Sequence, residues 1–139
     1  MVQKAPEFHK SVLGPEVSMW LITDPAGFYV DATVGGGGHA ECLLEKLNER
    51  GRLVGIDQDP KAVHEAKRRL SRFGDRAVVI KGTFWELKQI IGRFPNKVSG
   101  LLFDLGVSSH QIDDPQRGFS YRQDGPLDMR MSPSALWSA

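Results

Sequence analysis

The sequence has little cysteine and no long apolar run. Its one cysteine, Cys42, cannot form an internal disulfide or a thiolate metal site, and its position in a helical pattern predicts a small buried side chain. The longest apolar stretches, such as residues 19–22, have about four residues, whereas a membrane helix needs roughly 20. We therefore expect neither a disulfide scaffold nor a membrane-spanning helix.

Three further features are missing. No apolar segment follows the lysines of residues 1–10, so we expect no secretory signal and a cytoplasmic location. No second His or Cys stands at ligand spacing from His39, so we predict no metal. The net charge is only +1, so the charge balance neither supports nor excludes a nucleic-acid partner.

The composition is that of one soluble globular domain. The chain has 139 residues, of which 40% are hydrophobic and 25% charged. Short β-branched runs alternate with helical periods, which predicts an α/β fold with a parallel sheet. We expect strands at 28–33, 52–56, 77–80 and within 96–105, in the order 3-2-1-4 of a doubly wound sheet.

Helices are predicted between these strands. The first spans residues 15–22, with Val17, Trp20 and Leu21 inward, and the second contains Ala40, Leu43, Leu44 and Leu47. A third begins with Asp59 as N-cap, and a capping box from Thr83 to Glu86 opens the fourth, with Phe84, Leu87, Ile90 and Ile91 inward. No periodicity is found in residues 106–139, where we expect a functional loop or a disordered tail.

A glycine-rich segment, residues 35–38, lies between the first predicted strand and its helix. Glycines there let the backbone approach a ligand, and the helix N-terminus offers free N–H donors. Asp57 ends the second strand, 20 residues beyond Gly37, where a carboxylate can bind both hydroxyls of a ribose. Strand, loop, helix and terminal acid together predict a nucleotide site, although glycines also form plain tight turns.

Asp31 indicates which nucleotide. It stands before the glycines, where its charge is unfavourable beside a pyrophosphate but suits a ligand with an ammonium group. S-adenosylmethionine has that ammonium, a carboxylate for the helix N-terminus and a ribose for Asp57. The alternative is that Asp31 only caps a turn.

Three more residues allow two interpretations each. Phe84 can pack on an adenine or in the core. Asp104 ends the fourth strand and either faces the ligand crevice or caps the next turn. His39 is more often a helix-start residue than a catalytic one.

Long motifs then make the chain recognisable. They are Gly35–His39, Gly55–Pro60, Leu102–Ser109, Gln111–Ser120 and Asp124–Met131. In this order they resemble the bacterial small-subunit (16S) ribosomal RNA (cytosine-N4)-methyltransferases, cytoplasmic enzymes that use S-adenosylmethionine. The resemblance runs from about His9 to Met131.

The resemblance implies site residues. It implies that Gly37, Gly38 and His39 contact the methionine end of the cofactor, that Asp57 contacts the ribose, and that Phe84, Asp104 and Gln111 also belong to the cofactor site. The implied substrate is a cytidine of the decoding region, methylated on its exocyclic amine, in ribosomal RNA or the assembled small subunit. Asp104 and the turn of Ser108 and Ser109 are candidates for the proton acceptor.

Family members are longer than this chain. After the Met–Arg–Met segment they insert a substrate-recognition domain and then add strands, so we expect one methyltransferase domain with a Rossmann-like sheet that is incomplete at its C-terminal side. The last strand would then be an open edge prone to self-association. Arg117, Arg122 and Arg130 are candidate phosphate contacts, or else part of a solvated loop.

Two alternatives to an active methyltransferase remain at this point. One is an inactive relative that only binds S-adenosylmethionine or a ribosomal partner. The other is a nicotinamide-dependent oxidoreductase, which the glycine spacing and Asp57 allow but Asp31 and the motifs disfavour.

Overall fold

The computed structural model describes residues 11–138, which belong to two compact units. Residues 11–105 form one unit, and residues from 106 onward belong to the other. The first ten residues, with His9 and the segment examined for a secretory signal, lie outside the described residues. Within residues 11–138, no helix is both long and apolar enough to cross a membrane.

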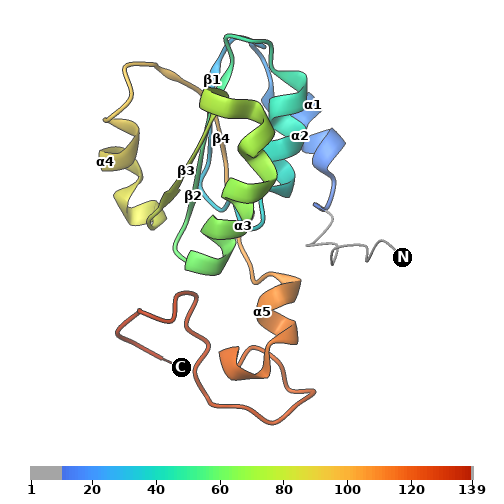
Figure 1. Ribbon diagram of the computed structural model, residues 1–139, viewed down its shortest axis with the longest axis vertical. Helices are drawn as coiled ribbons and strands as arrows, with labels where there is room; N and C mark the ends of the chain where they lie inside the picture. The colour runs from blue at the N-terminus through green and yellow to red at the C-terminus, as the bar shows by residue number, and fades with distance from the viewer. Residues whose placement is uncertain (1–10, 139) are drawn as a thin grey trace. The chain divides into compact units, whose positions relative to one another are not determined.

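The first unit is built on a four-stranded parallel sheet. Its strands are β1 (Phe28–Asp31), β2 (Arg52–Asp57), β3 (Ala77–Lys81) and β4 (Val98–Leu102). They are arranged in the order β3-β2-β1-β4, with Val30 opposite both Val54 and Leu101 (Figure 1). The predicted α/β class, parallel pairing and strand order are confirmed.

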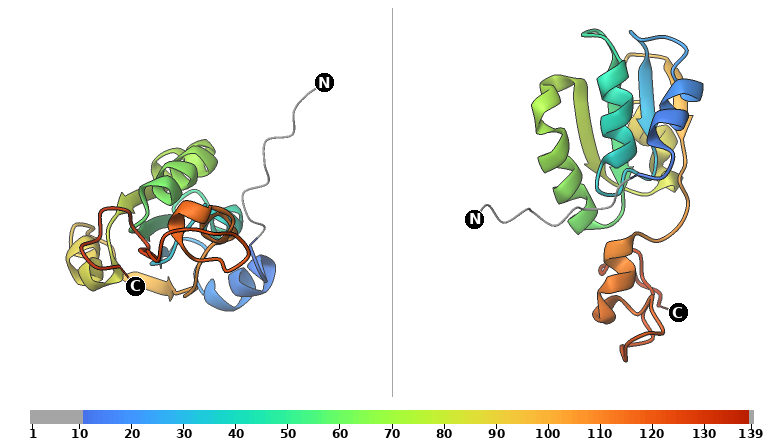
Figure 2. Two further views of the ribbon diagram at one scale, coloured as in Figure 1. Left: turned by 90° about the horizontal axis from the view of Figure 1, so that it is seen from below. Right: turned by 90° about the vertical axis from the view of Figure 1, so that its right-hand side faces the viewer.

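Helices cover both faces of this sheet. Helices α1 (Gly14–Leu21), α2 (Gly38–Lys46) and α3 (Pro60–Leu70) lie on one face, and the short α4 (Leu87–Ile91) lies on the other (Figures 1 and 2). The first face buries Tyr29, Leu43, Leu44 and Leu53, and the second buries Phe28, Val30, Val54 and Ile90. Successive side chains of β1 therefore pack into two apolar layers, one on each face of the sheet, as expected of a strand covered on both sides.

Two helix starts follow the predicted capping chemistry. The Asp59 side chain accepts a hydrogen bond of 2.9 Å from the Lys61 amide, with Pro60 in the first turn. Thr83 and Glu86 form the expected capping box, in which Glu86 accepts from the Thr83 amide at 2.8 Å. The box opens a 3₁₀ turn, η2 (Phe84–Glu86), and α4 begins only after it.

Two predicted inward residues point elsewhere. Trp20 is 81% exposed, because α1 packs on α2 through its small residues Gly14 and Ser18. A Cβ at Gly14 would lie 2.8 Å from the sulfur of Cys42, so only a small-residue face fits there. Phe84 is 40% exposed, because it lies in the 3₁₀ turn and outside the period of α4.

The second unit contains elements that periodicity did not predict. Helix α5 (Ser109–Asp113) and the 3₁₀ turn η3 (Pro115–Arg117) lie within the segment expected to be loop or tail. Both are too short to show a helical repeat of apolar residues in the sequence. Each begins at a side-chain N-cap: the Ser108 hydroxyl accepts from the Gln111 amide, and the Asp114 carboxylate accepts from the Gln116 amide. A further 3₁₀ segment, η1 (Ser71–Arg76), follows α3 in the first unit.

Candidate functional site

Three carboxylates lie at or beyond the carboxyl ends of adjacent strands. Asp31 is the last residue of β1, Asp57 is the last residue of β2, and Asp104 follows β4 by two residues. Because these strands are parallel, all three residues belong to one edge of the sheet, where open α/β sheets bind ligands. The predicted positions of Asp31 and Asp57 at strand ends are confirmed, whereas Asp104, expected to end the fourth strand, lies two residues beyond β4.

The glycine loop connects this edge to α2. Its geometry requires glycine at Gly35 and Gly37, whose φ angles are +51° and +85°. Gly37 is the N-cap of α2 and brings no side chain to cap the first turn. A Cβ on Gly37 would lie 3.3 Å from the Cα of Ala66, so the loop also packs tightly on α3. The uncapped start of α2 offers backbone N–H groups to an anion.

Asp57 holds the loop in place. Its Oδ2 accepts a hydrogen bond from the Gly35 amide at 2.9 Å, and its Oδ1 accepts one from the Asp59 amide at 2.9 Å. Burial raises the pKa of Asp57 above its usual range. The hydrogen bonds from these backbone donors lower the pKa, but their effect is smaller. Each carboxylate oxygen retains a second lone pair, so Asp57 can still accept from ligand hydroxyls.

Asp31 is buried with one oxygen unsatisfied. Its exposed fraction is 1%, and its Oδ1 accepts from the amide and hydroxyl of Thr33 at 3.1 and 3.4 Å. Its Oδ2 has no hydrogen-bond partner among the described residues. Burial raises the pKa of Asp31 to about 6. A buried carboxylate with an unpaired oxygen is costly, and a cationic group placed against it would remove that cost.

Thr33 and Arg69 are site residues that the sequence analysis missed. The Thr33 hydroxyl accepts from the Asp104 amide at 2.7 Å and thereby links Asp31 to the segment after β4. The signal was its position two residues after an aspartate, the spacing of an Asx turn. Arg69 of α3 donates to the Gly36 carbonyl at 3.4 Å. No local sequence pattern predicts this contact, because the two residues are 33 positions apart.

His39 connects the start of α2 to two other segments. Its Nδ1 lies 3.5 Å from Oδ2 of Asp104, and its Nε2 lies 2.8 Å from the carbonyl oxygen of Val12. The Asp104 side chain is 59% exposed, so it is open to solvent beside the largely buried imidazole. His39 is thus a helix-start residue, as expected, and its ring lies between the Val12 carbonyl and the Asp104 carboxylate.

Aromatic rings lie beside this edge. The Phe84 ring lies 5.7 Å from that of Trp85 and 6.3 Å, edge-on, from that of Phe103. The exposed fraction of Phe84 contradicts the core interpretation and leaves its ring available to a ligand. Trp85 and Phe103 were not singled out from the sequence.

Gln111 lies in the other compact unit. It is buried at the N-terminus of α5, where its Oε1 accepts from the Ser108 amide at 2.9 Å. The same turn engages the Ser108 hydroxyl, which accepts from the Gln111 amide at 3.2 Å. The structure therefore assigns Gln111 and Ser108 a capping role, and their proposed roles at the site remain predictions.

Two of the three arginines proposed as phosphate contacts already form hydrogen bonds within the second unit. Arg117 is buried and donates to the carbonyls of Arg130 and Met131 at 3.2 and 2.8 Å. Arg130 forms a two-pronged pair with Asp128, at 2.7 Å for each bond. Arg122 is exposed. Arg117 therefore serves the fold of its unit, which the sequence did not predict.

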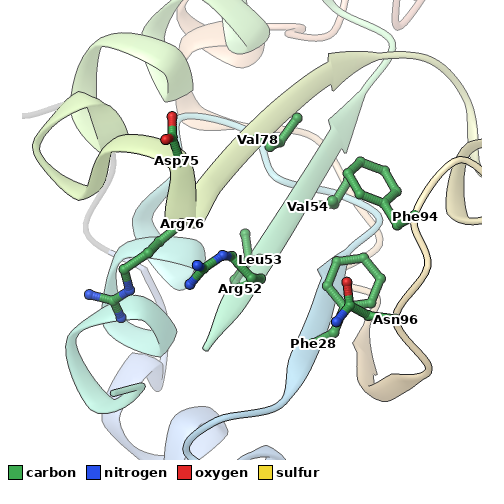
Figure 3. Close-up of a pocket in the computed structure, with 9 residues that line it drawn as sticks. All are labelled: Phe28, Arg52, Leu53, Val54, Asp75, Arg76, Val78, Phe94 and Asn96. Carbon is green, nitrogen blue, oxygen red and sulfur yellow. The ribbon is translucent and has the colours of Figure 1, made fainter. Parts of the chain in front are cut away.

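A pocket lies at the opposite edge of the sheet. It encloses about 190 Å³ between the amino-terminal parts of β1 and β2, η1 and the segment after α4 (Figure 3). Its lining includes Phe28, Arg52, Arg76 and Phe94. The Arg76 guanidinium donates to the carbonyls of Leu44 and Leu47, so it ties α2 to β3. None of the predicted site residues lines this pocket.

The first unit therefore combines four recognition features at one edge. They are a loop whose backbone is open to a ligand, an uncapped helix start, a carboxylate beside that loop and a buried carboxylate with one oxygen that accepts no hydrogen bond from residues 11–138. No cluster of three or more metal-ligating side chains occurs in residues 11–138. The arrangement suits an organic ligand with a carboxylate, an ammonium and a diol.

Comparison with known proteins agrees with this geometry. The model of the MraW methylase family matches residues 6–139. The "Ribosomal RNA small subunit methyltransferase H" of Heliobacterium modesticaldum is 46% identical over 133 residues, covering 94% of this chain and 42% of the relative. The chain spans less than half the length of the curated relatives it matches.

Solved structures show the same fold. A proposed rRNA methylase from Clostridium thermocellum has 25% identity and a TM-score of 0.58, covering 68% of this chain and 50% of that one. An O-methyltransferase from Bacillus cereus, solved in complex with SAH, has 20% identity and a TM-score of 0.55, covering 66% and 43%. The sheet and helices of the first unit are thus those of a methyltransferase fold.

Proposed function

Because the chain belongs to the MraW methylase family, we propose that it binds S-adenosylmethionine at the glycine loop and acts on small-subunit ribosomal RNA. The proposed reaction is methylation of the N4 amine of a cytidine in the decoding region. The proposed setting is the cytoplasm, with ribosomal RNA or the small ribosomal subunit as partner. The relative named as a ribosomal RNA small subunit methyltransferase supports this choice of substrate.

The observation that carries the proposal is the unpaired oxygen of Asp31. Its Oδ2 is buried beside the glycine loop and has no hydrogen-bond donor among the described residues. The ammonium of a methionine moiety is a cation with three N–H donors, which is the group that this oxygen lacks. A pyrophosphate at the same loop would instead face a buried carboxylate, so a nicotinamide dinucleotide fits less well.

The other groups of S-adenosylmethionine have matching residues. The backbone at Gly37, Gly38 and His39, at the start of α2, is suited to the carboxylate. Asp57 is suited to the ribose hydroxyls, and the half-exposed Phe84 ring to the adenine. The assignment of Gln111 to this site rests on the family resemblance alone.

Bound S-adenosylmethionine would supply an electrophilic methyl group to the cytosine amine. The chain's own contribution is positioning and proton removal, because the lone pair of that amine is delocalised into the ring. Asp104 is the proposed acceptor, with Oδ1 or Oδ2 taking the proton that N4 loses when it gains the methyl group. The His39 ring lies beside that carboxylate, with Nδ1 3.5 Å from Oδ2, and the Thr33 hydroxyl fixes the Asp104 backbone by accepting from its amide.

Calorimetric titration with S-adenosylmethionine tests the cofactor assignment. Asp31→Asn should weaken binding at least tenfold, because it removes the charge that faces the ammonium. Asp57→Ala should also weaken it, by loss of the ribose contacts. Asp75→Asn makes the same charge change at an exposed position in η1 and should bind as the parent does.

A second ligand separates the two aspartates. Methylthioadenosine keeps the ribose and adenine but lacks the amino-acid part, so Asp57→Ala should weaken its binding while Asp31→Asn should not. Equal effects of Asp31→Asn on both ligands would contradict the ammonium assignment. Binding of NAD in preference to S-adenosylmethionine would favour the oxidoreductase alternative.

Methyl transfer is tested with radiolabelled S-adenosylmethionine and small subunits that lack the modification. The proposal expects label in N4-methylcytidine after digestion of the RNA, and loss of label in Asp104→Asn. The second candidate is a module that binds cofactor without turnover. Cofactor binding with no transferred label would support that candidate.

Self-association through β4 is a further part of the proposal. β4 pairs with β1 on one side, and no other strand of residues 11–138 pairs with its second side. An unpaired strand edge offers backbone donors and acceptors to another chain. Sedimentation velocity should show concentration-dependent association. A monomer at all concentrations would contradict it.

A further inference from the structure

An exposed aromatic and basic surface lies beside the candidate cofactor site. It is formed by Trp85 of η2, Phe103 after β4, Lys81 at the end of β3 and Lys88 of α4. Trp85 is 86% exposed and Phe103 is 45% exposed. Neither ring is needed to close the two apolar clusters of the first unit, which do not include them.

Both rings contact the ring assigned to the adenine of the cofactor. Phe84 lies between them, with centroid distances of 5.7 Å to Trp85 and 6.3 Å to Phe103. Leu101 pairs with Val30 on the sheet face that α4 covers, so Phe103, two residues later, belongs to the same face. Phe103 also immediately precedes Asp104 in the sequence, and the Asp104 carboxylate is the proposed proton acceptor.

The charge of this segment favours a polyanion. Residues 81–97 contain four basic residues and one acidic residue, whereas the whole chain has a net charge of only +1. The acidic residue, Glu86, is occupied in the capping box with Thr83. Lys81 stands opposite Asp57 in the β2–β3 register and is therefore at the carboxyl edge. Lys88 follows Trp85 by three residues, the spacing of neighbours on a helical turn.

We propose that this surface binds single-stranded RNA, with bases stacked on Trp85 and Phe103 and phosphates contacted by Lys81 and Lys88. Aromatic platforms flanked by basic side chains bind unpaired bases of any sequence. A target base must leave its helix to reach a methyl donor, so its single-stranded neighbours need such a platform. The inference rests on the proposed function, because it places the RNA beside the cofactor and Asp104.

The first experiment measures the binding of a short fluorescein-labelled oligocytidine by fluorescence anisotropy, with S-adenosylmethionine present. Trp85→Ala should weaken binding about tenfold, within the range for one base–aromatic stack. Phe103→Leu keeps an apolar side chain but removes the ring and should act in the same direction. Trp20→Ala is the matched control, because Trp20 is 81% exposed, close to the 86% of Trp85, but lies on α1 at the other face of the sheet.

Salt dependence tests the two lysines. Replacing each of Lys81 and Lys88 with Gln should reduce the slope of log K against log salt by about 0.7, the value for one phosphate contact on a single strand. Lys46→Gln, at an exposed position on α2, should leave the slope unchanged. A direct readout comes from a variant in which Trp20 and Trp137 are replaced by Phe, where the oligonucleotide should quench the emission of Trp85.

Three results would overturn the inference. They are unchanged RNA binding in Trp85→Ala and Phe103→Leu, an equal loss in Trp20→Ala, and self-association that disappears in Trp85→Ala, which would make the surface an interface between copies of the chain. Titration with S-adenosylmethionine separates this failure from failure of the proposed function. A chain that binds cofactor but shows none of the RNA effects contradicts only this inference.

Discussion

The imidazole of His39 joins Asp104 to Val12, with Nδ1 3.5 Å from the Asp104 carboxylate and Nε2 2.8 Å from the Val12 carbonyl. This side chain links the segment before α1, the start of α2 and the segment after β4. His39→Ala should lower the free energy of unfolding by about 1 kcal/mol, mostly through the lost bond to Val12. Urea denaturation followed by circular dichroism measures it.

Asp104→Asn is the comparison for that variant. Because the Asp104 side chain is exposed, its pairing with His39 should contribute about 0.5 kcal/mol or less. A loss in Asp104→Asn as large as that in His39→Ala would show that the contact between His39 and Asp104, and not the bond to Val12, carries the stabilisation.

Asp31 should make stability fall as pH rises. Burial raises the pKa of Asp31 to about 6, above its value of 3.8 in an unfolded chain, so the folded state binds the proton more tightly. The contribution is therefore fully present below pH 3.8 and is lost as pH rises through about 6, an effect of up to about 3 kcal/mol by linkage.

Asp31→Asn isolates this effect from the other carboxylates. It should raise the free energy of unfolding by roughly 2 kcal/mol near neutral pH and change it little near the unfolded-state pKa. Urea denaturation at several pH values measures the difference between parent and variant. If the difference in the free energy of unfolding between parent and variant did not change with pH, the pKa of Asp31 would not be raised by folding. The same variant should bind S-adenosylmethionine more weakly, so stability and binding would change in opposite directions.

Gly37→Ala should destabilise the chain. The φ angle of Gly37 is +85°, which costs an L-residue about 1 kcal/mol or more. The added Cβ would also lie 3.3 Å from the Cα of Ala66. We expect a loss of about 2 kcal/mol in thermal unfolding, and a loss of less than about 1 kcal/mol would contradict the role of the contact with α3.

Arg117→Ala should loosen the second unit. Arg117 is buried and donates to the carbonyls of Arg130 and Met131, which would be left without these donors. Limited proteolysis should cleave residues 106–138 several times faster in this variant. The exposed Arg122 provides the control, and Arg122→Ala should be cleaved like the parent at all other sites. Equal cleavage in Arg117→Ala and the parent would show that these bonds are dispensable.

The sequence predicted the parts of this protein that depend on long patterns. Strand order follows from alternating strands and helices with crossovers of one hand, and the capping residues Asp59, Thr83 and Glu86 act locally. The edge position of Asp31, Asp57 and Asp104 follows from parallel strands.

What the sequence did not predict depends on contacts between distant segments. Trp20 is exposed because α1 approaches α2 through Gly14, and hydrophobicity alone gives no weight to a glycine face. Thr33 acquires its role by accepting from Asp104, 71 residues away. The unpaired oxygen of Asp31 is likewise visible only when all its neighbours are in place.

The central position of β1 has a consequence for the order in which this chain can fold on a ribosome. β1 lies between β2 and β4, and β4 begins at Val98. The hydroxyl of Thr33 receives the Asp104 amide only after all of the intervening residues have been synthesised. A nascent chain that has emerged only as far as α4 has the glycine loop but lacks one wall of the ligand site. Ligand binding should therefore begin only after the segment that follows β4 has left the exit tunnel.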